Sequence, residues 1–148
     1  MSADFNCDRI LDIALINRGT NDVSVLVGDV ITAMNRGPGE FIGGAKGEFP
    51  VRNVHTFLAE PTDLAVGDFN RDGIPDLAVL IGGTRRVSLL LSNRATKTHA
   101  VNAGFLVPGD GAVTGIVVAD FNSDGLLDIA VGGDAVRIFT GNGTIAGQ

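Results

Sequence analysis

One nine-residue pattern, D-F-N-x-D-x-x-x-D, occurs three times in this chain and constrains its fold more than any other feature. The copies run from Asp4 to Asp12, from Asp68 to Asp76 and from Asp120 to Asp128. Successive copies start 64 and 52 residues apart, which allows four short strands per repeat and is too long for an ankyrin or leucine-rich repeat. The spacing therefore predicts four-stranded units of the kind that form propeller blades.

The residues that flank the pattern favour strands. The second copy lies between the apolar stretches 64–67 and 77–81, and the third lies between 116–119 and 129–131. These stretches mix branched residues with alanine and glycine and are apolar on both faces, as in strands buried on both sides. No stretch repeats apolar residues with helical spacing over three turns, so we expect few helices. In the middle repeat the expected strands lie near 63–69, 76–82, 86–92 and 99–107.

We therefore predict an all-β chain of antiparallel β-propeller blades, of which about two and a half are present. The approximate blade limits are 1–62, 63–113 and 114–148, and the first and last blades are incomplete. A closed propeller needs at least about four blades, so a longer chain or association of two or three copies is expected to supply the others. The longest interruption, Ile31 to Phe49, is predicted to be an extended surface loop.

The pattern itself suits a metal ion. Oxygen-bearing side chains stand at positions 1, 3, 5 and 9, the carbonyl of position 7 can join them, and glycine at position 6 permits a sharp turn. An all-oxygen set with several carboxylates favours Ca²⁺. The loop is not an EF-hand, because position 12 is Val79 in one copy and Val131 in another. The predicted ligands are Asp68, Asn70, Asp72, the carbonyl of Ile74 and Asp76, and then Asp120, Asn122, Asp124, the carbonyl of Leu126 and Asp128.

The first copy offers Asp4, Asn6, Asp8 and Asp12 as equivalent ligands, but Arg9 replaces the glycine at position 6. A left-handed backbone costs a non-glycine residue about 1–2 kcal/mol, and the guanidinium brings a positive charge close to the site. Asp and Asn also make plain hydrogen-bonded turns. A turn without metal is therefore an alternative for all three copies. For the first copy, the metal site and the plain turn are equally supported by the sequence.

Two phenylalanines that precede the asparagine of the pattern point away from the predicted ion. Phe69 and Phe121, at position 2, are expected to anchor the second and third loops in the core.

Charge is concentrated in the three copies. The chain has 17 acidic and 11 basic side chains, for a net charge of -6, and nine of the acids occupy positions 1, 5 and 9 of the pattern. Two carboxylates about 4 Å apart repel by roughly 4 kcal/mol at an effective dielectric constant of 20, a cost that a divalent cation removes. The negative balance argues against nucleic-acid binding. The absence of an apolar run of about 18 residues argues against membrane insertion, and the first residues lack signal-peptide features.

The segments DFNRDGIPDLAV and DFNSDGLLDIAVGG resemble the FG-GAP/VCBS-type repeats of integrin-alpha-like β-propellers. The resemblance covers essentially the whole chain and is partial in the first copy. It implies a ring that usually has seven blades, with Ca²⁺ bound in each loop by the Asp and Asn side chains named above. It further implies a secreted or cell-surface module for adhesion that binds a protein or a glycan.

The preferred hypothesis is a non-enzymatic binding module in which calcium is structural, and no catalytic residue is predicted. Neither a G-x-S-x-G elbow nor an H-E-x-x-H pair occurs in the sequence. Two alternatives remain open. One is the accessory propeller of a calcium-dependent enzyme acting on polysaccharide. The other is a self-associating structural propeller protomer.

Overall fold

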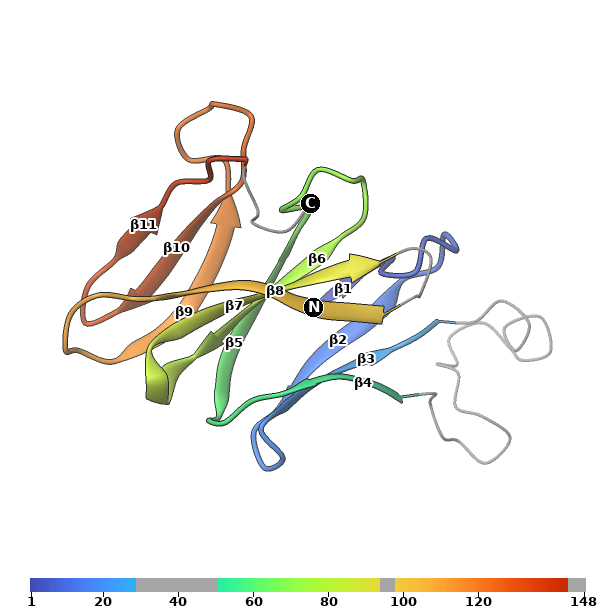
Figure 1. Ribbon diagram of the computed structural model, residues 1–148, viewed down its shortest axis with the longest axis horizontal. Helices are drawn as coiled ribbons and strands as arrows, with labels where there is room; N and C mark the ends of the chain where they lie inside the picture. The colour runs from blue at the N-terminus through green and yellow to red at the C-terminus, as the bar shows by residue number, and fades with distance from the viewer. Residues whose placement is uncertain (29–50, 94–97, 144–148) are drawn as a thin grey trace.

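A computed structural model of the chain describes residues 1–28, 51–93 and 98–143. Three antiparallel sheets follow one another along the chain and spread like a fan, as the blades of a partial propeller do (Figure 1). The all-β prediction is therefore confirmed. The loop predicted from Ile31 to Phe49 lies outside the described residues.

Each sheet is formed by consecutive strands. The first has the order β1 (Ser2–Ala3), β2 (Asp12–Asn17), β3 (Asp22–Leu26) and β4 (Val51–Thr56). The second has the order β5 (Pro61–Gly67), β6 (Asp76–Ile81), β7 (Arg86–Asn93) and β8 (Thr98–Leu106). The third contains β9 (Val113–Ala119), β10 (Asp128–Gly133) and β11 (Arg137–Phe139), with β10 in the middle. The four strands expected in the middle repeat are thus confirmed to within two residues at each end.

Helical structure in the described part of the chain is limited to one short 3-10 turn, η1 (Gly82–Thr84), between β6 and β7. No helix among the described residues is long and apolar enough to cross a membrane.

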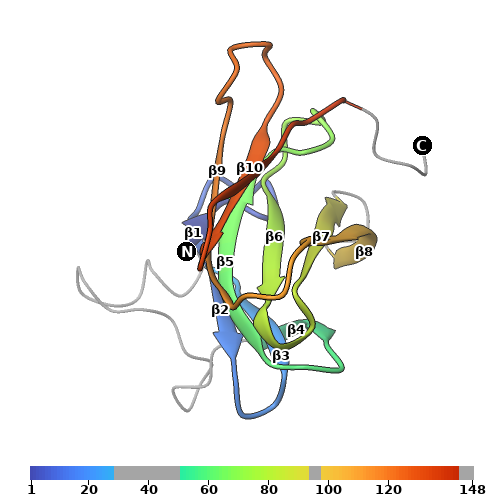
Figure 2. The ribbon, with the colours of Figure 1, turned by 90° about the vertical axis from the view of Figure 1, so that its left-hand side faces the viewer.

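The sheets pack face to face and enclose two apolar layers. In the view turned by 90°, the three sheets lie one behind another (Figure 2). Side chains alternate across a strand, so β6 contributes to both layers. Leu77 and Val79 enter the layer shared with the first sheet, whereas Ala78 and Leu80 enter the layer shared with the third sheet. All four side chains are fully buried. The middle sheet is therefore covered on both faces.

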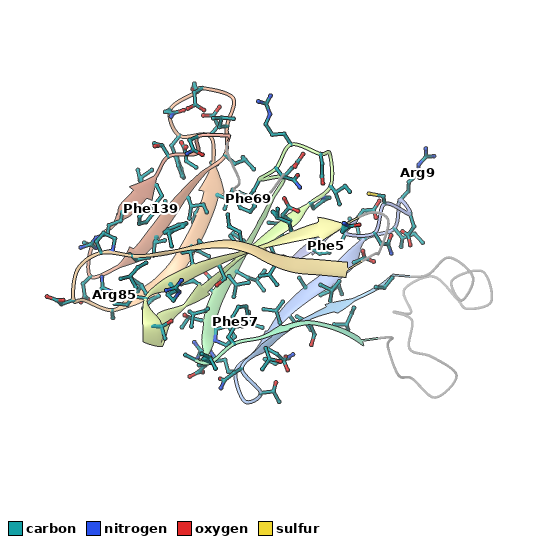
Figure 3. All side chains as sticks on the ribbon, viewed as in Figure 1. Phe5, Arg9, Phe57, Phe69, Arg85 and Phe139 are labelled. Atoms are coloured by element: carbon teal, nitrogen blue, oxygen red, sulfur yellow. The ribbon has the colours of Figure 1, made fainter. Side chains whose placement is uncertain are left out.

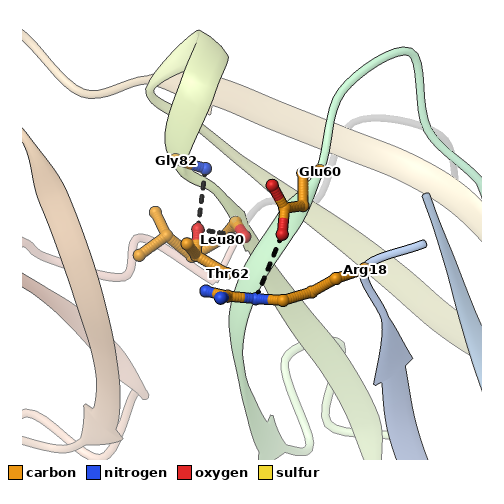
Figure 4. Close-up of polar contacts among 5 residues, drawn as sticks. All are labelled: Arg18, Glu60, Thr62, Leu80 and Gly82. Carbon is orange, nitrogen blue, oxygen red and sulfur yellow. Dashed lines mark hydrogen bonds and ion pairs between the residues drawn. The ribbon is translucent and has the colours of Figure 1, made fainter.

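Several polar contacts lie at the edge of the sheets opposite the Asp-rich loops (Figure 4). The Thr62 hydroxyl accepts a hydrogen bond from the Gly82 N–H at 2.7 Å and donates one to the Leu80 carbonyl at 3.1 Å. These bonds satisfy backbone groups where the β5–β6 register shifts. Arg18 and Glu60 form an ion pair, Nε to Oε1, at 3.3 Å. Because both side chains are more than half exposed, this pair contributes at most about 1 kcal/mol.

Candidate functional site

The three Asp-rich loops occupy the same position in each sheet. They connect β1 to β2, β5 to β6 and β9 to β10, and all three lie along the upper edge of the fan in Figure 1. The prediction that the pattern forms a loop between two strands is confirmed. One edge of the molecule therefore carries a row of similar acidic loops.

Hydrogen bonds from side chains to the backbone curl each loop. In the second loop, Asp68 accepts the N–H of Asp72 at 3.1 Å and that of Gly73 at 2.8 Å. Asn70 also accepts the Asp72 N–H, at 3.0 Å, and Asp72 accepts the N–H of Ile74 at 2.8 Å. The first and third loops repeat the same four bonds, made by Asp4, Asn6, Asp8, Asp120, Asn122 and Asp124. The first loop therefore folds as the other two do.

Two backbone positions in every loop are left-handed. Position 6 has a φ of 71° at Arg9, 82° at Gly73 and 83° at Gly125. Position 4 also has a positive φ, which the sequence did not indicate, because it is occupied by three unlike residues, Cys7, Arg71 and Ser123. Arg9 thus takes the conformation that glycine takes elsewhere, and its side chain extends away from the sheet (Figure 3). The first loop keeps its shape at the cost of backbone strain.

Replacing Arg9 by glycine is expected to raise the free energy of unfolding by about 1 kcal/mol, since the penalty for the left-handed backbone exceeds the added entropy of the unfolded chain. Urea unfolding measures the change. The matched variant Gly73→Arg should lose a similar amount, because open space surrounds Gly73 and only its φ of +82° opposes a side chain. A neutral or destabilising Arg9→Gly would contradict the strain argument.

The acids at position 9 lie deepest. Asp12, Asp76 and Asp128 are fully buried, and each carboxylate accepts two backbone N–H groups. One oxygen accepts from position 2 of the loop, at Phe5, Phe69 and Phe121, over 2.9–3.0 Å. The other accepts from Gly28, Ser92 and Gly141, at or beyond the end of the third strand, over 2.8 Å. The sequence predicted position 9 as a metal ligand, with a hydrogen-bonded turn as the alternative, and in the structure it ties the loop to the third strand of the sheet.

The acids of one loop act on each other electrostatically. Burial raises the pKa of Asp76 to about 6, the N–H groups of Ser92 and Phe69 oppose this rise, and the charges of Asp72 and Asp68 add to it. In the first loop, burial likewise raises the pKa of Asp12 above its ordinary value, with Asp8 and Asp4 contributing. In the first and second loops, the charges at positions 1 and 5 therefore lie close enough to act on the carboxyl group at position 9.

The donor chemistry of these loops fits a hard cation, because every predicted ligand atom is an oxygen. Among residues 1–28, 51–93 and 98–143, however, no group of three or more His, Cys, Asp or Glu residues is arranged to hold a metal ion. The loop carboxylates instead accept backbone N–H groups. Metal binding would have to recruit the Asn oxygen and the position-7 carbonyl as well. The ligand roles of these residues remain a prediction.

The phenylalanines at position 2 differ in burial. Phe5 is buried between the first and second sheets, and Phe69 packs against the layer between the second and third. Phe121 is 46% exposed, so the prediction that it anchors its loop in the core is wrong. Phe5 and Phe69 pack toward the sheet that follows their own, whereas no fourth sheet follows the third within the described residues. The position of Phe121 in the fan therefore determines its exposure.

A cavity of about 330 Å³ opens beside the second and third loops. Phe69, Phe105 and Phe139 contribute aromatic walls, and the rings of Phe105 and Phe139 lie 4.4 Å apart between centroids. Asp68 and Asn142 add polar groups to the lining. An aromatic wall with a few polar groups is a common composition for ligand pockets.

Together, the fan of antiparallel sheets and the repeated loop define a propeller-type repeat protein. Residues 68–131 match the FG-GAP-like repeat family, a segment that begins with the second loop and ends within β10. This match confirms the resemblance noted above for the second and third copies of the pattern, which it spans. No curated protein matches the chain.

Proposed function

We propose that this chain is a calcium-binding repeat module in which Ca²⁺ stabilises the blades and the blades bind a protein or a glycan. The observation that carries the proposal is the hydrogen-bonded curl that gathers the carboxylates at positions 1, 5 and 9 into one compact loop, at the cost of repulsion between like charges. A divalent cation among them would remove this cost. Ca²⁺ accepts six to eight oxygen ligands in flexible geometry, which suits a mixed set of carboxylate, amide and carbonyl oxygens.

The residues that would hold the ion are those of the sequence prediction. They are Asp68, Asn70, Asp72, Ile74 through its carbonyl, and Asp76, with their counterparts in the other two loops. If the loops behave as extracellular modules do, their dissociation constants are about 10⁻⁴–10⁻³ M. Occupancy at 100 times the dissociation constant would stabilise the fold by about 2.7 kcal/mol per site. A secreted or cell-surface setting, which the resemblance implies, is the setting in which modules of this affinity bind calcium.

The partner in this proposal binds at the loop edge. The cavity beside the second and third loops supports this, because Phe69, Phe105 and Phe139 offer aromatic faces next to the polar groups of Asp68 and Asn142. Such a combination suits the alternating apolar and hydroxyl surfaces of a sugar ring as well as a peptide side chain. The module has a binding role, and none of its residues is assigned to catalysis.

Thermal melts in Ca²⁺, Mg²⁺ and excess EDTA test the calcium sites. We expect Ca²⁺ to raise the melting temperature above that in EDTA, with Mg²⁺ giving little of the rise because it demands a stricter geometry. Asp72→Asn keeps an oxygen for the Ile74 N–H but removes one carboxylate, so the calcium-dependent rise should shrink. Asp110→Asn, an exposed site outside the loops, should leave it intact. Identical melts in all three buffers would reduce the loops to turn structures.

A further inference from the structure

The cavity beside the second and third loops has a wall that is fixed before any ligand enters. Gly141 passes so close to the carbonyl of Leu127 that no side chain fits at this position. Its N–H donates to the buried carboxylate of Asp128 at 2.8 Å, which ties this segment to the third sheet. Gly125 and Gly143 also line the cavity and add no side chains to fill it. The space of about 330 Å³ is therefore largely pre-formed.

The lining of the cavity favours a ligand that is apolar on its faces and polar at its edges. Phe105 and Phe139 present tilted rings, at an interplanar angle of 44°, and the negative face of such a ring attracts C–H groups. Asp68, Thr140 and Asn142 add polar groups. A hydrocarbon group would remove water from these groups without replacing its hydrogen bonds, which costs free energy, whereas the hydroxyl groups of a sugar would replace them. The volume lies near the lower limit for ligand pockets and suits a single six-membered ring.

One cation in the lining has no acidic partner. Arg71 lines the cavity, and its guanidinium group makes no ion pair or hydrogen bond within the described part of the chain. The carboxylate of Asp68 is already engaged by its own loop, because its two oxygens accept the N–H groups of Asp72 and Gly73. A carboxylate on the ligand would therefore meet an available guanidinium group, the cation that pairs best with this anion.

The folding of the loop does not require an arginine at this place. Arg71 occupies position 4, where the first and third loops have Cys7 and Ser123 with nearly the same positive φ. Three unlike side chains therefore support the same backbone, and only the arginine brings a charge to the cavity. An acidic ligand would give Arg71 a role that the shape of the loop does not.

We propose that the cavity binds a hexuronate, a six-membered sugar ring that carries a carboxylate, as one residue of an acidic glycan. The ring packs on Phe105 and Phe139, its hydroxyl groups meet the polar groups of the lining, and its carboxylate pairs with Arg71. This inference rests on the proposed binding role of the loop edge and selects the glycan from the two kinds of partner given there.

Amide chemical shifts in NMR spectra test the assignment, with methyl glucuronoside and methyl glucoside as probes in the presence of Ca²⁺. The two sugars differ only in the carboxylate, which replaces a hydroxymethyl group. We expect the glucuronoside to shift the amide signals of Gly125, Gly141 and Gly143 saturably. It should bind about tenfold more tightly than the glucoside, the effect of one hydrogen bond to a charged group. Arg71→Ser should remove this preference and keep the loop, since Ser123 has the same position in the third loop.

Two further variants separate the charge from the aromatic wall. Arg86→Ser is the matched control, because Arg86 is an exposed arginine at the start of β7 and does not line the cavity. It should keep the preference for the glucuronoside. Phe139→Leu retains an apolar side chain but removes an aromatic face, so it should weaken the binding of both sugars.

Three results would overturn the inference. Equal affinity for the two sugars, or a preference that Arg71→Ser leaves unchanged, would exclude recognition of the carboxylate. The absence of saturable shifts with either sugar would exclude a glycan, and saturable shifts with N-acetylphenylalanine instead would assign the cavity to a peptide. The thermal melts described above separate this failure from failure of the calcium sites. A calcium-dependent rise in melting temperature without sugar binding would reject the hexuronate site alone.

Discussion

Asp76→Ala is expected to lower the free energy of unfolding by about 3–5 kcal/mol, the largest loss we predict for a single polar residue of this chain. The substitution leaves the N–H groups of Phe69 and Ser92 without the carboxylate that accepts them at 3.0 and 2.8 Å. Each buried donor without an acceptor costs about 1–3 kcal/mol, and loss of the repulsion from Asp68 and Asp72 returns only part of this. Urea unfolding followed by far-UV circular dichroism measures the difference.

The unfolding of Asp76→Ala should be measured in excess EDTA, so that the hydrogen-bonding role of Asp76 is separated from any role in calcium binding. Asp76→Asn should fall between the wild type and Asp76→Ala, because the amide oxygen replaces one acceptor while its NH₂ group faces the other donor. Asp110→Ala is the matched control, since Asp110 is exposed and outside the loops. If Asp76→Ala cost no more than this control in EDTA, the carboxylate would not hold the loop to β7.

Leu77→Ala and Leu80→Ala are each expected to destabilise the chain by about 2–5 kcal/mol, the usual range for a leucine removed from a packed core. The two side chains lie on opposite faces of β6, and both are fully buried. A strand with one solvent face would lose this much at only one of them. Chemical unfolding of both variants therefore tests whether the middle sheet is sandwiched between its neighbours.

Leu58→Ala provides the control for these two variants. Leu58 is fully exposed, and truncation of such a side chain usually changes stability by no more than about 0.5 kcal/mol. A large loss at Leu77 together with a loss at Leu80 no greater than that at Leu58 would mean that the third sheet does not cover the second.

The sequence predicted those features that are encoded locally. The pattern gave the three loops, and the apolar runs gave the four strands of the middle repeat, because each of these signals lies within or beside the element that it predicts. The left-handed conformation at position 4 carries no such signal. The loop imposes it when Asp68 and Asn70 both accept the N–H of Asp72, whatever residue occupies position 71.

Features that depend on distant segments could not be predicted in this way. The second partner of Asp76 is the N–H of Ser92, 16 residues further along the chain, and nothing in the pattern itself indicates that contact. Phe121 has the same place in its repeat as Phe5 and Phe69, yet its burial depends on whether another sheet packs beside the third. The sequence of one repeat does not indicate which sheets will pack beside it, and so it cannot predict the burial of its phenylalanine.

The buried acid at position 9 has a consequence for how a blade opens. Because Asp76 binds the start of its loop and the end of β7 at once, the loop cannot detach from β6 without also releasing β7. The loop and the three inner strands of a blade thus form one cooperative unit, and their amide hydrogens should become accessible to solvent together. A cation or a partner that binds the loop would therefore also stabilise β7, which lies two strands away from β5 in the same blade.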